Sequence, residues 1–398
     1  MLEYFPTHYS WNLAVLMAEQ LGGELTEIDG ACRPLRTIAE RPDARNDPDA
    51  QAAWIAAWSD LGKRVEAFAA RDEDAGHRWS AGRKYRRACI YYFTAERMAS
   101  HKSPDKLALY GAMTRCFEKS VRLRNEPIEF VVIPYEDTTL PALLYRAPGA
   151  GRRPAMIHFD GFDVTKEWMH LCGIAEEFGV RGISTLMVDH PGVGAALRLQ
   201  HLPMNMESER WASAALEWLG ERADVDASRV GVIAMSLGGY YAPRAAAFEP
   251  RLACCVAWGA RWDNEASHGR ILRDPQAARS VSAWLDHALW YYGAADADEA
   301  AKKISAMKLE GIVERIACPL LVAHGLHDRQ VPLEQAERTV RAARQSSRAD
   351  LRVFGDDEGG VEHCSGDQFA TAIDAMTDWV ADVLHAPGSR EGDGIRRA

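Results

Sequence analysis

The spacing of apolar residues changes near residue 127. Residues 49–70 (DAQAAWIAAWSDLGKRVEAFAA) and 107–123 (LALYGAMTRCFEKSVRL) carry apolar side chains at intervals of three and four. This spacing is typical of amphipathic helices. Strand-like patterns are almost absent up to this point. The pattern predicts a helical N-terminal domain over residues 1–126, and Pro127 marks its end because proline disfavours a helical conformation at the residue before it.

After Pro127, short apolar runs alternate with amphipathic stretches. Runs at 128–136 and 140–146 flank a short polar turn and predict a hairpin. Further runs, several of them apolar throughout as in strands buried on both faces, predict strands at 155–160, 183–189, 229–235, 252–259, 319–325 and 349–355. Helical patterns such as 207–221 and 333–345 separate most of them. The alternation predicts an α/β fold with a mainly parallel, doubly wound sheet.

One connection in this region is too long for a simple crossover. About sixty residues separate the strand that ends at Gly259 from the strand that begins at Pro319, and residues 281–293 have a helical pattern. We therefore expect a helical cap insertion at about 263–316 within a core that spans 127–386. The polar, glycine-rich tail at 387–398 is expected to be disordered.

Composition and charge narrow the function classes. The chain has 398 residues, of which 47% are hydrophobic and 26% charged, and its formal net charge is −10. This acidic balance argues against a nucleic-acid partner, which would require a basic face. No C-x-x-C pair, basic leader or run of eighteen apolar residues occurs. We expect a cytoplasmic protein that does not bind a membrane.

A serine follows directly from one of the predicted buried strands. The strand at 229–235 runs into Ser236-Leu237-Gly238-Gly239, and a helical pattern comes next. Ala234-x-Ser236-x-Gly238 is a variant of the G-x-S-x-G nucleophile elbow, in which small residues flank the serine so that strand and helix can approach closely. Ser236 is the predicted nucleophile. The alternative is that Ser236 merely caps the helix.

The partners of such a serine can be sought by chain order. In folds built around a nucleophile elbow, the serine comes first along the chain, the acid second and the histidine third. Beyond the last predicted strand lie His363, in a loop rich in glycine and acidic residues, and His385, in the polar tail. His363 is therefore the predicted base. Asp328, just after the strand at 319–325, is the predicted acid that accepts a hydrogen bond from its Nδ1. Asp263, after the strand that ends at Gly259, is the rival acid.

Two backbone N–H groups form the oxyanion hole in this fold. The first belongs to Leu237, the residue after the serine. Phe162, in the loop after the strand at 155–160, is the expected second donor. Three side chains beyond a later strand exit, Trp262, Asp263 and Glu265, are candidates for substrate contacts.

Two other patterns are compatible with a bound cofactor or metal, but each has a plainer interpretation. Gly192 and Gly194 resemble the start of a dinucleotide fingerprint, yet its third glycine position holds Leu197. Strand exits also carry possible metal ligands, for which hydrogen-bonded loop and core positions are the favoured interpretation: His158, Asp160, Asp189 and His190. We predict no cofactor and no metal.

Four motifs together resemble a known family. The segments MSLGGYYAPRAAA, GFDVTKE, HGLHDRQVPL and EHC are similar to those of α/β-hydrolases of the fermentation-respiration switch type. Within that group the resemblance is to 2,6-dihydroxypseudooxynicotine hydrolases and to fungal hydrolases that shorten polyketide chains. It covers roughly residues 85 to 385 and implies an α/β-hydrolase fold, Ser236, Asp328 and His363 as the catalytic triad, and Leu237 and Phe162 as oxyanion donors. It also implies that the helical domain is a lid and that the protein is a homodimer.

The resemblance implies a reaction as well. Family members cleave C–C bonds of β-diketone-like aromatic or polyketide substrates through an acyl-enzyme, so we expect a small-molecule substrate of this kind. A carboxylesterase, thioesterase or acyltransferase with the same triad is the alternative. A third hypothesis, from a different class, is a non-catalytic binding protein on the same fold.

Overall fold

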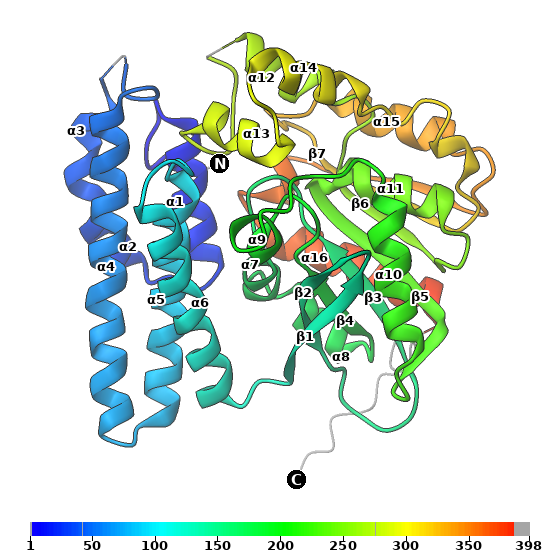
Figure 1. The fold of residues 1–398 in the computed structure, drawn as a ribbon, viewed down its shortest axis with the longest axis horizontal. Helices are drawn as coiled ribbons and strands as arrows, with labels where there is room; N and C mark the ends of the chain where they lie inside the picture. Colours follow the sequence, from blue (N-terminus) through cyan, green and yellow to red (C-terminus); the bar gives the residue numbers. More distant parts are fainter. Residues whose placement is uncertain (1, 42, 275, 386–398) are drawn as a thin grey trace. The chain divides into compact units, whose positions relative to one another are not determined.

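A computed structural model describes residues 2–41, 43–274 and 276–385 (Figure 1). The tail predicted to be disordered, 387–398, lies outside the described residues. The chain forms two compact units. The first, here called the helical unit, contains Met1–Glu126 and Arg270–Ala301, and the second, here called the sheet unit, contains Pro127–Gly269 and Lys302–Ala398.

The helical unit contains three long helices, two of which cover the segments with helical spacing in the sequence. On α4, Trp54, Trp58, Leu61 and Val65 are buried at intervals of three and four residues, and Trp54 stacks on Trp11 with ring centroids 4.7 Å apart. The helices before residue 127 are α1 (Tyr9–Gln20), α2 (Leu25–Cys32), the 3₁₀ turn η1 (Arg33–Leu35), α3 (Arg36–Ala39), α4 (Pro48–Asp74), α5 (Arg78–Met98) and α6 (Asp105–Arg124).

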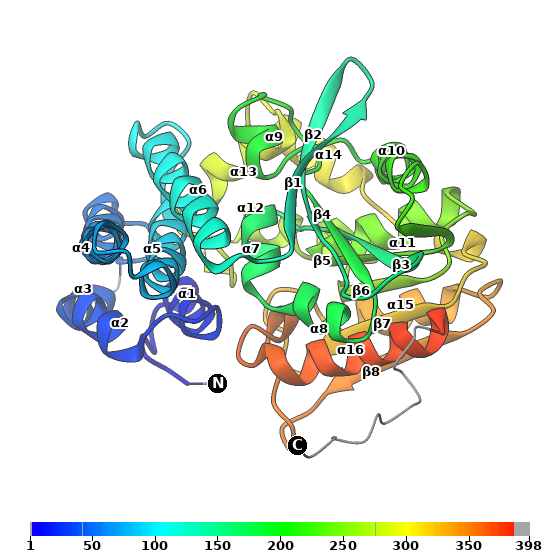
Figure 2. The same cartoon turned by 90° about the horizontal axis from the view of Figure 1, so that it is seen from below.

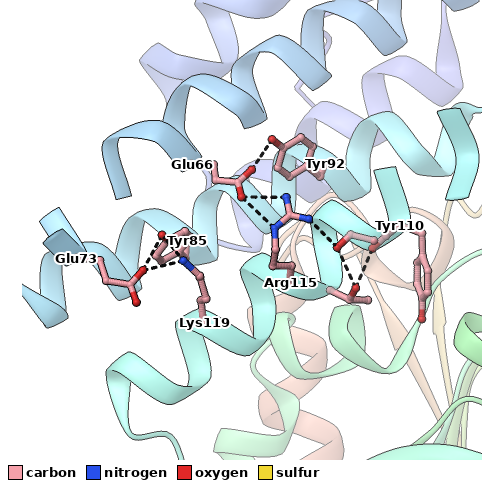
Figure 3. A network of polar contacts seen from close by, with 9 residues as sticks. Glu66, Glu73, Tyr85, Tyr92, Tyr110, Arg115 and Lys119 are labelled. Atoms are coloured by element: carbon pink, nitrogen blue, oxygen red, sulfur yellow. Dashed lines mark hydrogen bonds and ion pairs between the residues drawn. The ribbon is translucent and has the colours of Figure 1, made fainter. Parts of the chain in front are cut away.

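A repeated polar contact joins these three long helices (Figure 3). Glu66 of α4 accepts hydrogen bonds from Tyr92 of α5 at 2.7 Å and from Arg115 of α6 at 3.0 Å. Two turns along α4, Glu73 accepts from Tyr85 and from Lys119, each at 2.8 Å. A glutamate, a tyrosine and a basic residue thus meet twice at helical spacing. The order of these contacts shows that α5 runs antiparallel to α4 and that α6 runs parallel to it.

The segment Arg270–Ala301 belongs to the helical unit through direct contacts. Arg279 donates hydrogen bonds to the Arg45 carbonyl and the Asn46 side chain. Asp286, on α13 (Trp284–Tyr292), accepts hydrogen bonds from Ser100 and Lys102, each at 2.6 Å. The segment that the sequence predicts as a core cap insertion at about 263–316 is therefore divided between the units. Its helical pattern gives no sign of this, because the contacts join residues far apart in the chain.

The sheet unit is built on eight strands in the order β1-β2-β4-β3-β5-β6-β7-β8. Strands β1 and β2 form the predicted hairpin, β2 and β4 are also antiparallel, and all other neighbours are parallel. The predicted α/β fold with a mainly parallel sheet is confirmed. The strands are β1 (Ile128–Tyr135), β2 (Thr138–Tyr145), β3 (Arg153–Phe159), β4 (Ser184–Val188), β5 (Val225–Leu237), β6 (Cys255–Ala260), β7 (Leu320–Gly325) and β8 (Ala349–Phe354).

Helices cover both faces of the sheet. Helix α8 packs against α16, and α10 packs against α11 on the other side (Figure 2). Besides α13, the helices that follow β3 are α7 (Lys166–Leu171), α8 (Ile174–Val180), α9 (Gly194–Arg198), α10 (Ser208–Gly220), α11 (Gly238–Phe248), α12 (His268–Arg273), α14 (Ala297–Ala306), α15 (Leu333–Ala342) and α16 (Phe369–Leu384), with 3₁₀ turns η2 (Asn264–Ala266), η3 (Val313–Arg315) and η4 (His363–Ser365). Among the described residues, no helix combines the length and the apolar character of a bilayer span.

The strand order places a switch point beside β3. The chain leaves β3 toward β4 on one side, then crosses to β5 on the other. Ligands of open α/β sheets bind at such points, beyond the carboxyl ends of the strands. The loop after β3 and the end of β5, where the chain enters α11, are therefore the two segments from which a site should be built.

Candidate active site

Ser236 is the last residue but one of β5, directly before α11, and its backbone conformation is strained. The φ of Ser236 is +61°, in the left-handed region that non-glycine residues avoid. A Cβ added to Gly238 would lie 2.6 Å from the Cβ of Ala234, and one added to Gly239 would lie 1.9 Å from the Gly259 carbonyl oxygen. These approaches explain why small residues flank the serine in the sequence.

The close approach of Ala234 and Gly238 gives a testable pair of variants. Gly238→Ala should destabilise the fold by about 1–3 kcal/mol, because the new methyl overlaps the Ala234 methyl. Ala234→Gly in the same chain should restore much of that loss, since the nearest remaining atom, the Asp160 carbonyl oxygen, lies 3.2 Å away. Urea unfolding of the two single variants and the double variant measures this coupling. Additive losses would contradict the proposed steric cause.

His363 lies against Ser236. Its Nε2 is 2.8 Å from the Ser236 hydroxyl. It begins the short turn η4 (His363–Ser365), in which both Cys364 and Ser365 have positive φ, at +49° and +54°. Two consecutive non-glycine residues in this region turn the chain sharply, and the Cys364 thiol donates to the Trp258 carbonyl at 3.3 Å. The turn therefore joins the His363 loop to β6, next to the serine.

Asp328 lies on the far side of the imidazole. Its Oδ2 is 2.7 Å from Nδ1 of His363, while its Oδ1 accepts hydrogen bonds from the backbone N–H groups of Gln330 and Val331, each at 2.8 Å. The carboxylate is thus fixed by its own loop. Asp263, the rival acid, accepts from the Glu265 N–H and lies 3.5 Å from the Lys308 ammonium. The structure therefore brings Ser236, His363 and Asp328 together and gives Asp263 other partners.

Burial and charge act in opposite directions on this pair. Burial lowers the pKa of His363, but the Asp328 carboxylate outweighs it and raises that pKa above the ordinary value. For Asp328, burial raises the pKa, while His363 and the loop N–H groups hold it below its ordinary value. A buried carboxylate that stays ionised stabilises the imidazolium form of its neighbour. The arrangement can therefore take a proton from Ser236 and hold it.

The loop after β3 passes beside the serine. A Cβ added to Gly161 would lie 2.9 Å from the Ser236 Cβ and 3.1 Å from the Leu237 backbone nitrogen. Glycine at position 161 permits this contact, and it brings the next residue, Phe162, to the edge of the turn. Leu237 and Phe162, the two residues predicted to provide oxyanion N–H groups, thus directly follow Ser236 and Gly161, which lie close together.

The predicted substrate-contact residues have partners outside this group. Glu265 accepts a hydrogen bond from Ser305 at 2.7 Å. The ring of Trp262 lies under the Arg338 guanidinium, 5.1 Å from its centroid. The side-chain hydrogen bonds recorded for Ser236 and His363 join them to each other, to Asp328 and to Cys364. The role of Trp262, Asp263 and Glu265 in substrate binding stays a prediction.

The strand exits considered as metal-ligand positions make other contacts. His158 is fully buried within β3, and burial lowers its pKa to about 3. Asp189 accepts a hydrogen bond from the Lys166 ammonium at 2.9 Å. The two ring nitrogens of His190 lie 3.0 Å and 2.9 Å from the carbonyl oxygens of Asp160 and Pro191. The contacts of Asp189 and His190 agree with the hydrogen-bonded interpretation favoured on the sequence, whereas His158 is a core position whose ring nitrogens have no hydrogen-bond partner among the described residues.

Two residues beside the site were not singled out from the sequence. His324, four residues before Asp328, places its Nε2 3.7 Å from the same carboxylate oxygen that contacts His363. The Cys364 sulfur lies 3.6 Å from Nε2 of His363. Both residues lie within motifs that carry the family resemblance, HGLHD and EHC. Neither a histidine nor a cysteine at these positions indicates a role until the distances are known.

Comparison with known proteins agrees with the fold. The prolyl oligopeptidase family profile matches residues 212–386. The crystal structure of a 2,6-dihydroxy-pseudo-oxynicotine hydrolase superposes with a TM-score of 0.74 over 93% of this chain and 95% of its own, at 24% identity. The structure titled AbyA5 Wildtype gives a TM-score of 0.68 at 18% identity, over 93% of this chain and 94% of its own. The chain therefore has the α/β-hydrolase fold.

Curated relatives are themselves named hydrolases. A 2,6-dihydropseudooxynicotine hydrolase from Paenarthrobacter nicotinovorans is 27% identical over 351 residues, which cover 86% of this chain and 88% of that protein. The 20-hydroxy-prefusarin hydrolase FUS2 of Gibberella moniliformis is 26% identical over 313 residues, 69% of this chain and 73% of its own. The resemblance to this bacterial hydrolase and to fungal hydrolases, which the motifs indicate, is confirmed.

Proposed function

We propose that this chain is a serine hydrolase in which Ser236, His363 and Asp328 form the catalytic triad. The observation that carries the proposal is the continuous contact from the Ser236 hydroxyl through both nitrogens of His363 to Asp328, with the serine on a strained turn. Nucleophile, base and orienting acid in this order are the elements of acyl-transfer catalysis. No cofactor is required.

The proposed substrate is a small molecule with a β-diketone-like group, aromatic or polyketide in character. Ser236 attacks one carbonyl carbon, and His363 takes the hydroxyl proton. The oxyanion accepts hydrogen bonds from the backbone N–H groups of Leu237 and Phe162. The C–C bond to the activated carbon then breaks, its electron pair is delocalised into the second carbonyl as an enolate, and His363 returns the proton to that carbon.

Water completes the cycle. His363 accepts a proton from water as the water oxygen attacks the acyl carbon, and the Ser236 oxygen leaves and is reprotonated. The net reaction adds one water, and yields a carboxylic acid and a ketone. An ester passes through the same steps with an alcohol as leaving group, so an esterase, thioesterase or acyltransferase is the alternative that the same residues support. The two relatives are named as hydrolases of a dihydropseudooxynicotine and of a hydroxy-prefusarin, and neither is named as an esterase, which favours C–C bond cleavage.

The bond that is cut can be tested with two substrate series. Purified protein is incubated with aryl β-diketones and with p-nitrophenyl esters of matched acyl chains, and products are identified by mass. We expect diketones to give an acid plus a methyl ketone, with kcat/KM at least ~10-fold above the esters, because a substrate that fits the closed site uses its binding energy in the transition state. Efficient ester turnover with inert diketones would leave the esterase alternative.

We infer three further properties on the same basis. The helical unit serves as a lid that excludes water from the reaction, the protein is a homodimer, and it acts in the cytoplasm. Light scattering on a sizing column tests the dimer. A monomer at micromolar concentration would contradict it.

A further inference from the structure

The loop that carries Phe162 is held at both ends by two consecutive residues. It runs from Asp160, at the exit of β3, to Lys166, the first residue of α7. The residues that hold it are Asp189 and His190, which directly follow β4. All four are buried in the sheet unit.

Asp189 fixes the end of the loop that enters α7. Its Oδ1 accepts a hydrogen bond from the Lys166 backbone N–H at 2.8 Å, and its Oδ2 accepts from the Lys166 ammonium at 2.9 Å and from the Ala195 N–H at 2.8 Å. A Cβ on Gly194 would lie 1.9 Å from this carboxyl group, so the carboxylate has no room to move on that side. With this end fixed, the peptide at the other end, between Asp160 and Gly161, also bears on the position of Phe162.

His190 contacts that other end. Its Nε2 lies 3.0 Å from the Asp160 carbonyl oxygen and its Nδ1 lies 2.9 Å from the Pro191 carbonyl oxygen. Its ring stacks on Trp211 with centroids 5.2 Å apart and planes 5° apart, and the Tyr241 ring meets it edge-on. The imidazole is therefore locked in orientation, with a nitrogen aimed at each carbonyl.

A neutral imidazole can satisfy one of these two acceptors at a time. Carbonyl oxygens accept hydrogen bonds and a neutral ring carries one N–H. Burial lowers the pKa of His190 to about 4, so the ring is neutral near pH 7. The tautomer therefore decides whether the Asp160 carbonyl is held.

We propose that His190 is a positioning residue for the oxyanion hole. Its Nε2–H donates a hydrogen bond to the Asp160 carbonyl and so fixes the peptide that leads to Gly161 and Phe162. The proposal rests on the proposed function, because it requires the Phe162 N–H to face the reacting oxygen. A Cβ on Gly161 would lie 2.9 Å from the Ser236 Cβ and 3.1 Å from the Leu237 backbone nitrogen, so Gly161 lies close to the nucleophile and rotation of the preceding peptide displaces the donor. A displacement of about 1 Å at such a position costs roughly 10²-fold in rate.

Two matched substitutions separate the two ring nitrogens. The amide nitrogen of a glutamine can occupy the place of Nε2, and that of an asparagine the place of Nδ1. His190→Gln can thus keep the bond to Asp160, whereas His190→Asn keeps the bond to Pro191. The probe is an alkyl fluorophosphonate, whose phosphoryl oxygen occupies the oxyanion hole when Ser236 attacks phosphorus and fluoride leaves.

We expect His190→Asn to lower the second-order rate of Ser236 phosphonylation by about 10- to 100-fold, and His190→Gln to remain within about 3-fold of the unsubstituted protein. With p-nitrophenyl acetate the loss should fall on kcat with KM unchanged, since the donor acts on the transition state. Equal rates for the two variants at equal Tm would overturn the proposal. An unsubstituted protein whose Ser236 does not react would instead overturn the proposed function.

A measurement on the unsubstituted protein covers the case in which the variants do not fold. The ¹⁵N shifts of His190, assigned through its contact with the Trp211 indole, report which ring nitrogen carries the proton at pH 7. The expected result is a protonated Nε2 and an unprotonated Nδ1. The opposite tautomer would show that His190 holds Pro191 and not the oxyanion loop, and would overturn the proposal.

Discussion

Ser236→Ala is expected to lower kcat by about 10³- to 10⁶-fold. The alanine lacks the oxygen that contacts Nε2 of His363 at 2.8 Å, so no acyl-enzyme can form. The fold should persist, because alanine has the same Cβ at this positive φ as serine. Steady-state turnover, together with intact-mass detection of the acyl-enzyme or of the fluorophosphonate adduct, measures the loss.

A matched serine provides the control for this variant. Ser365 lies two residues from His363, also at positive φ, and its hydroxyl makes no hydrogen bond in the described structure. Ser365→Ala should keep turnover within about 3-fold, as expected for the loss of a hydroxyl that has no partner. Near-native turnover in Ser236→Ala would remove the covalent mechanism.

Asp328→Asn is expected to lower kcat by about 10⁴-fold, because an amide in this position favours the wrong tautomer of His363. The carboxylate accepts from Nδ1 at 2.7 Å, which leaves Nε2 unprotonated and facing Ser236. The asparagine amide can donate to Nδ1, which puts the proton on Nε2. Asp263→Asn is the matched control and should retain activity, since Asp263 contacts Lys308 and the Glu265 N–H.

The same variant should shift the pH profile in a defined direction. His363 must be neutral to accept the serine proton, so activity falls as the pH drops below the pKa of His363. Asp328 raises that pKa, and its neutral replacement lowers it, so the rising limb of residual activity should move to lower pH. If the rising limb does not shift, another charge sets the pKa of His363. If Asp263→Asn loses activity while Asp328→Asn stays active, Asp263 and not Asp328 is the acid of the triad.

Much of the fold could be predicted because its signals are local. Every predicted strand has its counterpart in the sheet, since runs such as 230–235 are apolar throughout when helices cover both faces. The order of serine, acid and histidine could be predicted by counting, because parallel strands deliver their exit loops to one edge of the sheet. For the same reason Ser236, Asp328 and His363 could be chosen without coordinates.

What could not be predicted depends on contacts between distant segments. His190 carries no signal for its contact with Asp160, because the separation of thirty residues is bridged by the pairing of β3 and β4. The sequence also does not predict which unit contains Arg270–Ala301, since the amphipathic pattern of this segment would fit either unit. The side chains near Trp262 were proposed from position alone, and their partners, Lys308, Ser305 and Arg338, lie up to about eighty residues further along the chain.

The discontinuous helical unit has a consequence for how the protein is made. Met1–Glu126 leaves the ribosome first, but Arg270–Ala301, which supplies Arg279 and Asp286 to that unit, follows only after Pro127–Gly269 has been synthesised. At ordinary translation rates this delay is roughly 7 to 30 s. During that interval α1 to α6 expose the surface that the later segment covers, so nascent chains should depend on chaperones most strongly in this window.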